Sequence, residues 1–352
     1  MAADISVDED LAVQAFLTKA GRFPITRHNL KGDLGSRRFE RLTYKDGSTE
    51  ILMVSLPASH PNFTPGHRLE DYIKIAETLK SHGLRAPEIY EFDLDSNLAL
   101  MEDFGDMTFI RAIEHGASNE ELTRQAAEIL EVLRNIPVDN TLPDFMHSHI
   151  IKGHKRFVDW YCPVLFGGMI DDDRIESFLS VWDEIFKSLP PPQNGFVYLD
   201  FHFGNLMLLK NGQAGLLDFQ GAMYGPQAYD ITNLLQDARR DTKPQIRQAV
   251  LNETVQGMTK GEAESFRLWY DVLACHFHCR VIGQFIKLAY LHGKTGHLEN
   301  LPRLERYIAE NASQSDILKP LHKWLIENNI LFDKTPEINM DCLAKIIRED
   351  AI

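Results

Sequence analysis

Three polar side chains with the chemistry of phosphoryl transfer lie in the stretch 197–220. Asp200 falls in a short loop, Asn205 follows five residues later, and Asp218 ends an apolar run. Phosphoryl transfer needs one group that orients the attacking hydroxyl and accepts its proton, and oxygen ligands that hold Mg²⁺ against nucleotide phosphates. We therefore expect Asp200 to be the catalytic base and Asn205 and Asp218 to be the metal ligands.

The elements around these residues predict how the two metal ligands meet. Residues 206–209 and 214–217 form short apolar strands, and Asn211-Gly212 between them is a strong hairpin signal. Such a hairpin would hold Asn205 and Asp218 at the same end. The pattern thus predicts that two residues thirteen positions apart share one ion.

The first hundred residues predict a β-rich region. The expected helices are 8–20, with Leu11, Ala15, Phe16 and Ala20 on one face, and 67–82. The expected strands cover 25–31, the alternating run from residue 39, 50–56, 88–93 and 98–101.

Small residues Gly32, Gly35 and Ser36 lie between the first two of these strands. Glycines here would let backbone N–H groups approach phosphates closely, as in a nucleotide-binding loop. A plain β-hairpin with a flexible tip is the alternative.

A change of pattern at 102–106 predicts the boundary between two lobes. We expect 1–101 to be an N-lobe with a nucleotide-binding sheet and one main helix, 102–106 to be a hinge, and 107–352 to be a helical C-lobe. The C-lobe would carry the catalytic loop and the metal motif. The predicted helices are 119–136, 148–162, 172–188, 227–238, 243–257, 261–291, 300–311 and 316–328. The fold class is therefore α+β with two lobes.

Composition excludes several classes of function. The 352 residues carry a net charge of −14, which argues against a nucleic-acid binder because no basic stripe is available to neutralise phosphates. The N-terminus has no basic and apolar leader, and no run reaches the roughly 18 apolar residues of a membrane span. Four cysteines over this length indicate no disulfide framework. We expect a cytoplasmic protein without a membrane partner.

Two aromatic and sulfur-rich segments are expected to belong to the core. Phe157, Trp160 and Tyr161 could stack on a sugar ring, but burial in a helical core is the favoured interpretation. Cys275 and Cys279 lie one helical turn apart with two histidines between them, which could suggest a zinc site. No second Cys/His pair at zinc-finger spacing accompanies them, so a structural place within an apolar helix is the favoured interpretation.

The central motifs resemble a known family. Y-L-D-F-H-F-G-N at 198–205 and D-F-Q at 218–220 resemble the aminoglycoside phosphotransferase-like branch of the protein-kinase-like fold. Further stretches look similar to the bacterial anomeric N-acetylmuramate/N-acetylglucosamine kinases. They are G-D-L-G-S-R-R-F at 32–39, E-D-F-G-D at 102–106, N-L-M-L-L at 205–209, the run 218–230, R-V-I-G-Q-F at 280–285 and L-P-R at 301–303.

This resemblance implies a kinase that uses ATP and Mg²⁺ to phosphorylate a hydroxyl of an amino sugar, a reaction of cell-wall recycling. The cofactor-binding residues that it implies are Gly32, Gly35, Ser36, Arg37, Arg38, Glu102, Asp103 and Phe104. The implied partner is a small molecule. Oligomeric state is not encoded in any readable pattern.

Three positions depart from the family pattern. Tyr198 stands where the family usually has histidine, and Met53 lies near the place of the strand lysine of protein kinases, so Arg37 or Arg38 is expected to contact phosphate instead. Gly153 lies near the position where the subfamily usually has a glutamate. An aminoglycoside or other small-alcohol kinase, and a nucleotide-binding regulatory pseudokinase, therefore stay open as alternatives.

Overall fold

The computed structural model describes residues 7–30, 37–60, 63, 68–138 and 142–351. Two compact units make up the chain. Unit 1 comprises Met1–Ser118 and Phe203–Ala222, and unit 2 comprises Asn119–His202 and Met223–Ile352. The chain changes unit within the central stretch, so Asp200 belongs to unit 2 whereas Asn205 and Asp218 belong to unit 1. The lobe boundaries drawn from the sequence stay a prediction.

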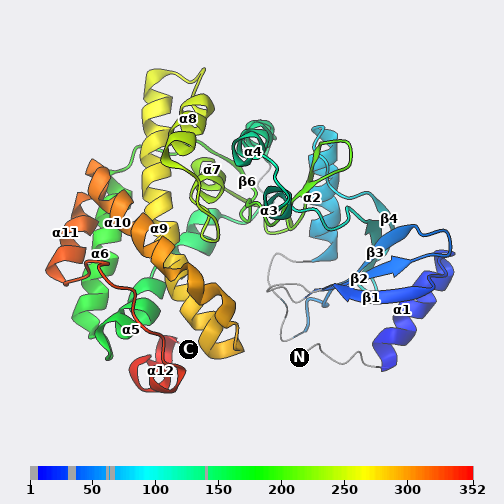
Figure 1. The fold of residues 1–352 in the computed structure, drawn as a ribbon, viewed down its shortest axis with the longest axis horizontal. Helices are drawn as coiled ribbons and strands as arrows, with labels where there is room; N and C mark the ends of the chain where they lie inside the picture. The colour runs from blue at the N-terminus through cyan, green and yellow to red at the C-terminus, as the bar shows by residue number, and fades with distance from the viewer. Residues whose placement is uncertain (1–6, 31–36, 61–62, 64–67, 139–141, 352) are drawn as a thin grey trace. The chain divides into compact units, whose positions relative to one another are not determined.

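A five-stranded antiparallel sheet forms the framework of unit 1 (Figure 1), and its strand order is β1-β2-β3-β5-β4. The strands are β1 (Thr26–Leu30), β2 (Arg38–Thr43), β3 (Thr49–Val54), β4 (Ile89–Asp93) and β5 (Leu98–Glu102). The central strands β3 and β5 are the most apolar and the most buried, as expected for strands with neighbours on both edges. The predicted N-terminal sheet is confirmed.

Helix α1 (Val7–Lys19) packs on this sheet through a face different from the predicted one. Val13, Phe16 and Leu17 are buried against strand residues that include Leu52. Leu11 is 58% exposed, so the face drawn through Leu11 was wrong. The i, i+3, i+4 stripe that starts at Val13 is the one that reaches the sheet.

Two further helices and a hairpin complete unit 1. Helix α2 (Leu69–Ser81) buries Tyr72, whose hydroxyl donates to the sulfur of Met101 on β5. Helix α3 (Phe109–Glu114), which the sequence reasoning did not predict, begins at the capping residue Thr108. The hairpin β7 (Leu206–Leu208) and β8 (Ala214–Leu216) is joined to these segments by backbone hydrogen bonds, one of them from Leu216 N–H to the carbonyl of Arg85.

Unit 2 is mainly helical. Its α-helices are α4 (Asn119–Arg134), α5 (Cys162–Phe166), α6 (Asp172–Ser188), α7 (Ala228–Leu235), α8 (Pro244–Thr254), α9 (Lys260–His292), α10 (Leu301–Gln314), α11 (Lys319–Glu327) and α12 (Met340–Ile346). Shorter turns are η1 (Met146–Ile151), η2 (Phe157–Tyr161), η3 (Thr295–Asn300), η4 (Asp316–Leu318) and η5 (Glu349–Ala351). The predicted single helix over 148–162 is instead two π-helical turns, η1 and η2.

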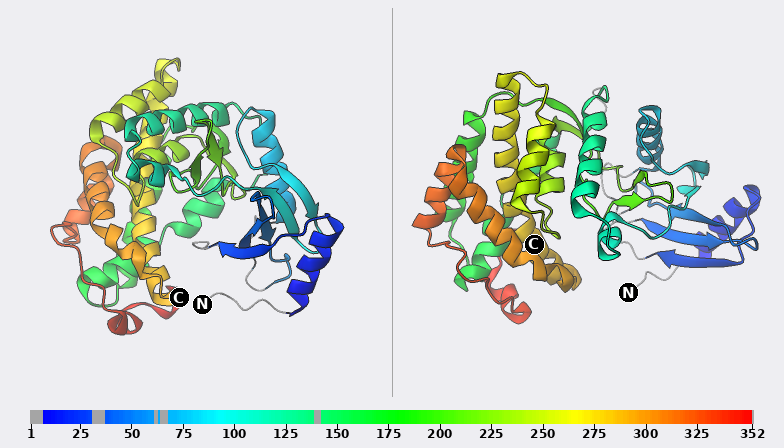
Figure 2. Two further views of the ribbon diagram at one scale, coloured as in Figure 1. Left: turned by 45° about the vertical axis from the view of Figure 1, so that its right-hand side comes forward. Right: turned by 45° about the horizontal axis from the view of Figure 1, so that its top comes forward.

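The long helix α9 organises unit 2. A capping box between Thr259 and Glu262 starts it, and Gly293 in the left-handed conformation ends it. It packs against η2, α7 and α10, and Figure 2 shows α10 running beside it in both views. Strands β6 (Asn194–Val197) and β9 (Met223–Pro226) pair with each other, β6 contacts α4, and the two strands lead into and out of the central stretch. No helix among the described residues is long and apolar enough to cross a membrane.

Gly283 permits the close packing of α9 on η2, which generates a prediction. A Cβ at Gly283 would lie 2.0 Å from the backbone oxygen of Arg156, so Gly283→Ala must push the two elements apart. We expect this substitution to lower the free energy of unfolding by about 1–3 kcal/mol, as measured by urea denaturation.

Gly261 on the same helix is the matched control, because a Cβ there would meet nothing within 4 Å. Gly261→Ala should leave stability unchanged or raise it by up to about 1 kcal/mol. Equal effects of the two substitutions would contradict the packing assigned to Gly283.

Candidate active site

The loop that carries Asp200 begins in an unusual backbone conformation. Leu199 has a φ of 82°, in the left-handed region that a branched residue seldom adopts. Asp230 on α7 holds it there, because its carboxylate accepts hydrogen bonds from the backbone N–H of Tyr198 at 2.6 Å and of Leu199 at 3.0 Å. Asn233, one turn later, donates to the carbonyl of Leu199 at 2.7 Å. The expected structural role of Asp230 is confirmed.

The surroundings of Asp230 determine its ionisation. Burial raises the pKa of Asp230 to about 7, the two backbone N–H donors oppose this rise, and the nearby charge of Asp200 adds to it. Asp230 and Asp200 therefore lie close enough to influence each other within unit 2. A strained turn and a buried carboxylate at one place are typical of functional sites.

Tyr198 packs into the interior of unit 2. Its side chain is fully buried, and its ring meets that of Phe201 edge to face at 5.2 Å between centroids. The backbone of Tyr198 is the part that Asp230 binds. The tyrosine thus fills space beneath the loop while the loop's backbone contacts to α7 are retained.

The two expected metal ligands lie at the same end of the β7–β8 hairpin in unit 1. Leu206 pairs with Leu216, and the N–H of Leu217 donates to the carbonyl of Asn205 at 3.0 Å. Asp218 follows directly, with a φ of 62°. The predicted hairpin geometry is confirmed, and it supplies one amide and one carboxylate oxygen of the kind that Mg²⁺ prefers.

The two residues after Asp218 are also fixed. Phe219 stacks on Tyr72 of α2 with ring centroids 4.6 Å apart, and the side-chain amide of Gln220 donates to the carboxylate of Asp218 at 2.5 Å. These contacts orient Asp218, as the supporting contacts of a metal ligand should.

Arg37 lies beside this motif, whereas Arg38 is engaged elsewhere. The guanidinium of Arg37 lies over the ring of Tyr72, and burial lowers its pKa although the charge of Asp218 opposes the change. Arg38 forms ion pairs with Glu9 and Glu40 at 2.5 and 3.0 Å. Of the two arginines, Arg37 is therefore the one near a metal-ligand candidate.

The expected hinge residues are held by two arginines of unit 1. Asp103 forms a bidentate pair with Arg41, at 2.6 and 2.9 Å, and the pKa of Asp103 is lowered because hydrogen bonds outweigh the effect of burial. Glu102 accepts from Arg85 at 2.5 Å. Arg85 also lies over the ring of Phe104.

Several other predictions concern residues outside this arrangement. Gly32, Gly35 and Ser36 lie outside the described residues, so the phosphate-loop interpretation stays a prediction. The three aromatic residues at 157, 160 and 161 are buried, which confirms the core interpretation. Among the residues that the structure describes, no three His, Cys, Asp or Glu side chains form a group that could hold a metal ion, the Cys275–Cys279 segment included.

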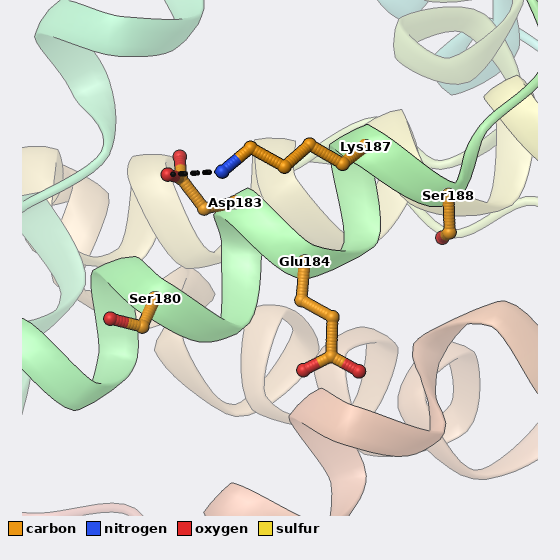
Figure 3. Close-up of a pocket in the computed structure, with 5 residues that line it drawn as sticks. All are labelled: Ser180, Asp183, Glu184, Lys187 and Ser188. Atoms are coloured by element: carbon orange, nitrogen blue, oxygen red, sulfur yellow. Dashed lines mark hydrogen bonds and ion pairs between the residues drawn. The ribbon is translucent and has the colours of Figure 1, made fainter.

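A surface depression on α6 is unrelated to this chemistry. Figure 3 shows its lining side chains on one helix, with Lys187 paired to Asp183 at 3.3 Å. Both side chains are mostly exposed, and none of the predicted site residues lines the depression.

The bonds between Asp230 and the catalytic loop lead to a prediction. In Asp230→Asn the side chain keeps one acceptor oxygen and gains a donor that faces a backbone N–H, so one buried donor loses its partner. We expect the free energy of unfolding to fall by about 1–3 kcal/mol in chemical denaturation.

Asp173 is the matched control in the same unit, because it is exposed at the start of α6. Asp173→Asn should change stability by less than about 0.5 kcal/mol. An Asp230→Asn protein as stable as the Asp173→Asn control would show that the Asp230 bonds do not hold the loop.

Known proteins resemble this chain in sequence and in fold. A kinase named N-acetylmuramate/N-acetylglucosamine kinase from Neisseria meningitidis serogroup B is 26% identical in an alignment 311 residues long that covers 84% of this chain and 88% of that relative. The kinase of the same name from Caulobacter vibrioides is 26% identical in an alignment 337 residues long that covers 86% of this chain and 92% of the relative.

Solved structures share the fold at lower identity. Choline kinase LicA from Streptococcus pneumoniae superposes with a TM-score of 0.55 at 13% identity, over 87% of this chain and 100% of that one. An ADP-bound aminoglycoside phosphotransferase gives 0.54 at 13% identity, over 90% and 99% of the two chains. The model of the phosphotransferase enzyme family matches residues 27–263. The chain therefore belongs to the phosphotransferase enzyme family and is a kinase.

Proposed function

We propose that this kinase transfers the γ-phosphoryl group of ATP to a hydroxyl of an amino sugar of the N-acetylmuramate/N-acetylglucosamine type. The observation that carries the proposal is the Asp200 loop, which Asp230 and Asn233 hold in a left-handed turn. The acceptor class is supported by relatives named for those two sugars, which align with most of the chain.

In this proposal Asp200 orients the acceptor hydroxyl and accepts its proton. Phosphoryl transfer has a loose transition state, so positioning and neutralisation of charge supply most of the rate. The anomeric hydroxyl of a sugar is more acidic than an ordinary alcohol, which lowers the demand on the base. We therefore propose the anomeric oxygen as the acceptor atom.

Asn205 and Asp218 would hold Mg²⁺, and Arg37 would contact a phosphate. The bound ion neutralises charge on the transferring phosphoryl group. The fixed conformation at Asp218 and the position of Arg37 near it support these assignments.

The nucleotide segments complete the proposal. Gly32, Gly35 and Ser36 would approach the phosphates with their backbone N–H groups. The carboxylates of Glu102 and Asp103 are engaged by Arg85 and Arg41, so we propose that residues 102–104 contact the nucleotide through the backbone. Because ATP is the donor, we propose the cytoplasm as the location. Because the products would be phosphates of cell-wall amino sugars, we propose a role in recycling cell-wall material.

The role of Asp200 predicts the outcome of a coupled ADP assay. With N-acetylglucosamine or N-acetylmuramate as acceptor, Asp200→Asn should lower kcat by about 10²–10⁴-fold, because the amide cannot accept the proton. Asp173→Asn is the control and should retain activity.

This assay also separates the proposal from its competitors. A regulatory pseudokinase would bind nucleotide and produce no acceptor-dependent ADP. Turnover with aminoglycosides but with neither sugar would contradict the amino-sugar assignment.

The metal ligands predict a dependence on Mg²⁺. Removal of divalent ions with a chelator should abolish ADP formation, and added Mg²⁺ should restore it. Asp218→Asn should require a higher Mg²⁺ concentration for half-maximal activity, since a neutral amide binds the ion more weakly than a carboxylate. An unchanged Mg²⁺ titration in Asp218→Asn would exclude Asp218 as a ligand.

A further inference from the structure

A group of cationic and polar side chains lies in unit 2 and has no role in the chemistry described above. Its members are Arg156 at the start of η2, Arg280 on α9, Tyr229 on α7 and His149 on η1, which we call the arginine cluster.

Arg280 is held firmly but with part of its hydrogen-bonding capacity unused. Its Nη2 donates to the hydroxyl of Tyr229 at 3.1 Å, and its guanidinium lies over the ring of Phe277. A Cβ at Gly153 would lie 2.4 Å from its Cδ, so the glycine makes room for the arginine stem. The Nε of Arg280 is buried and has no hydrogen-bond partner among the described residues.

Tyr229 links Arg280 to His149. The hydroxyl of Tyr229 lies 2.9 Å from Nε2 of His149. The pKa of His149 is lowered well below its ordinary value by burial and by the charges of Arg280 and Arg156, so the imidazole is neutral at pH 7. The tyrosine hydroxyl therefore accepts from Arg280 and connects it to a neutral imidazole, which adds no charge to that of the arginines.

Contacts of one segment with α9 bring the two arginines near each other, because Gly153 meets the Cδ of Arg280 and the backbone of Arg156 meets Gly283. Burial and the charge of Arg280 lower the pKa of Arg156 to about 10. Within the described part of the chain, neither guanidinium forms an ion pair with Asp or Glu. Gly283 lets the backbone of Arg156 approach α9, so the proximity of the like charges is built into the packing of two elements. Two half-buried guanidinium groups without a counter-ion are a typical binding site for a carboxylate or phosphate.

The arginine cluster also lies near the proposed base. Tyr229 directly precedes Asp230 on α7, and the Asp230 carboxylate binds the backbone N–H groups of Tyr198 and Leu199 just before Asp200. The charge of Asp200 accordingly raises the pKa of Tyr229, which burial also raises and Arg280 lowers. An anion bound by the arginines would therefore belong to the molecule that presents its hydroxyl to Asp200.

We infer that Arg156 and Arg280 bind a carboxylate on the acceptor sugar, so that the enzyme prefers an acidic amino sugar to its neutral counterpart. This inference rests on the proposed function and adds the charge of the substrate to it. N-acetylmuramate carries such a carboxylate and N-acetylglucosamine does not. A comparison of the two sugars therefore isolates the contribution of the carboxylate.

The test compares the two sugars in the coupled ADP assay with saturating Mg-ATP. The unaltered enzyme should have the higher kcat/KM on N-acetylmuramate. Arg280→Gln and Arg156→Gln should each lower kcat/KM for N-acetylmuramate by about tenfold to a hundredfold, mainly through KM, because a charge-assisted hydrogen bond is lost. The kcat/KM for N-acetylglucosamine should change by less than about threefold, which is less than the loss of one such hydrogen bond would cause.

Two variants keep this test independent of folding. Arg280→Lys retains the charge without the planar fork and should recover part of the preference for N-acetylmuramate. Arg267→Gln on the same helix is the control. Arg267 contacts Asn252 at the surface, so its loss should alter neither sugar's kinetics. Calorimetric titration of each sugar without nucleotide reads binding separately from turnover.

Each contrary outcome has a distinct meaning. Equal losses for both sugars, or equal kcat/KM of the unaltered enzyme on both, would overturn the carboxylate site and leave the proposed kinase function standing. A rise in KM for ATP in Arg280→Gln with unchanged sugar constants would assign the arginines to nucleotide phosphate, which also overturns it. Failure of the unaltered enzyme to bind or phosphorylate either sugar would overturn both proposals.

Discussion

The bonds from Asp230 to the backbone of Tyr198 and Leu199 are the constraint on which the candidate site depends. A left-handed leucine is unfavourable by itself, and the two N–H bonds together with the Asn233 contact hold it in place. The loop that follows begins with Asp200. A buried carboxylate on a helix thus fixes the start of the loop that carries the proposed base. Replacement of Asp230 by an apolar residue would leave these backbone N–H groups without their acceptor.

The remaining site residues depend on a different device. The β7–β8 hairpin returns the chain so that Asp218 follows the backbone bond between Leu217 and Asn205. Stacking of Phe219 on Tyr72 then ties the metal motif to α2, and Arg37 lies over the same tyrosine ring. A helix therefore fixes the loop of Asp200, and a hairpin fixes the proposed metal ligands.

Local patterns predicted much of this arrangement. The Asn211-Gly212 turn between apolar strands indicated the hairpin, and the spacing of Asp200 from the metal ligands indicated phosphoryl transfer. Tertiary contacts were beyond such reasoning. The packed face of α1 was misplaced because Leu11 looks equally apolar in sequence, and the arginine cluster was missed because Arg156 and Arg280 lie far apart along the chain. The close approach allowed by Gly283 was the one available signal, since a glycine inside an apolar helix often marks such a contact.

The most direct test of the central claim is the position of the phosphate on the product. Incubation with Mg-ATP and N-acetylglucosamine, followed by ³¹P NMR with coupling to protons, identifies the carbon that carries the new phosphate. If the anomeric oxygen is the acceptor, the new phosphate will couple to the anomeric proton at C1. A phosphate on the C6 hydroxyl, or ATP consumed without any sugar phosphate, would contradict it.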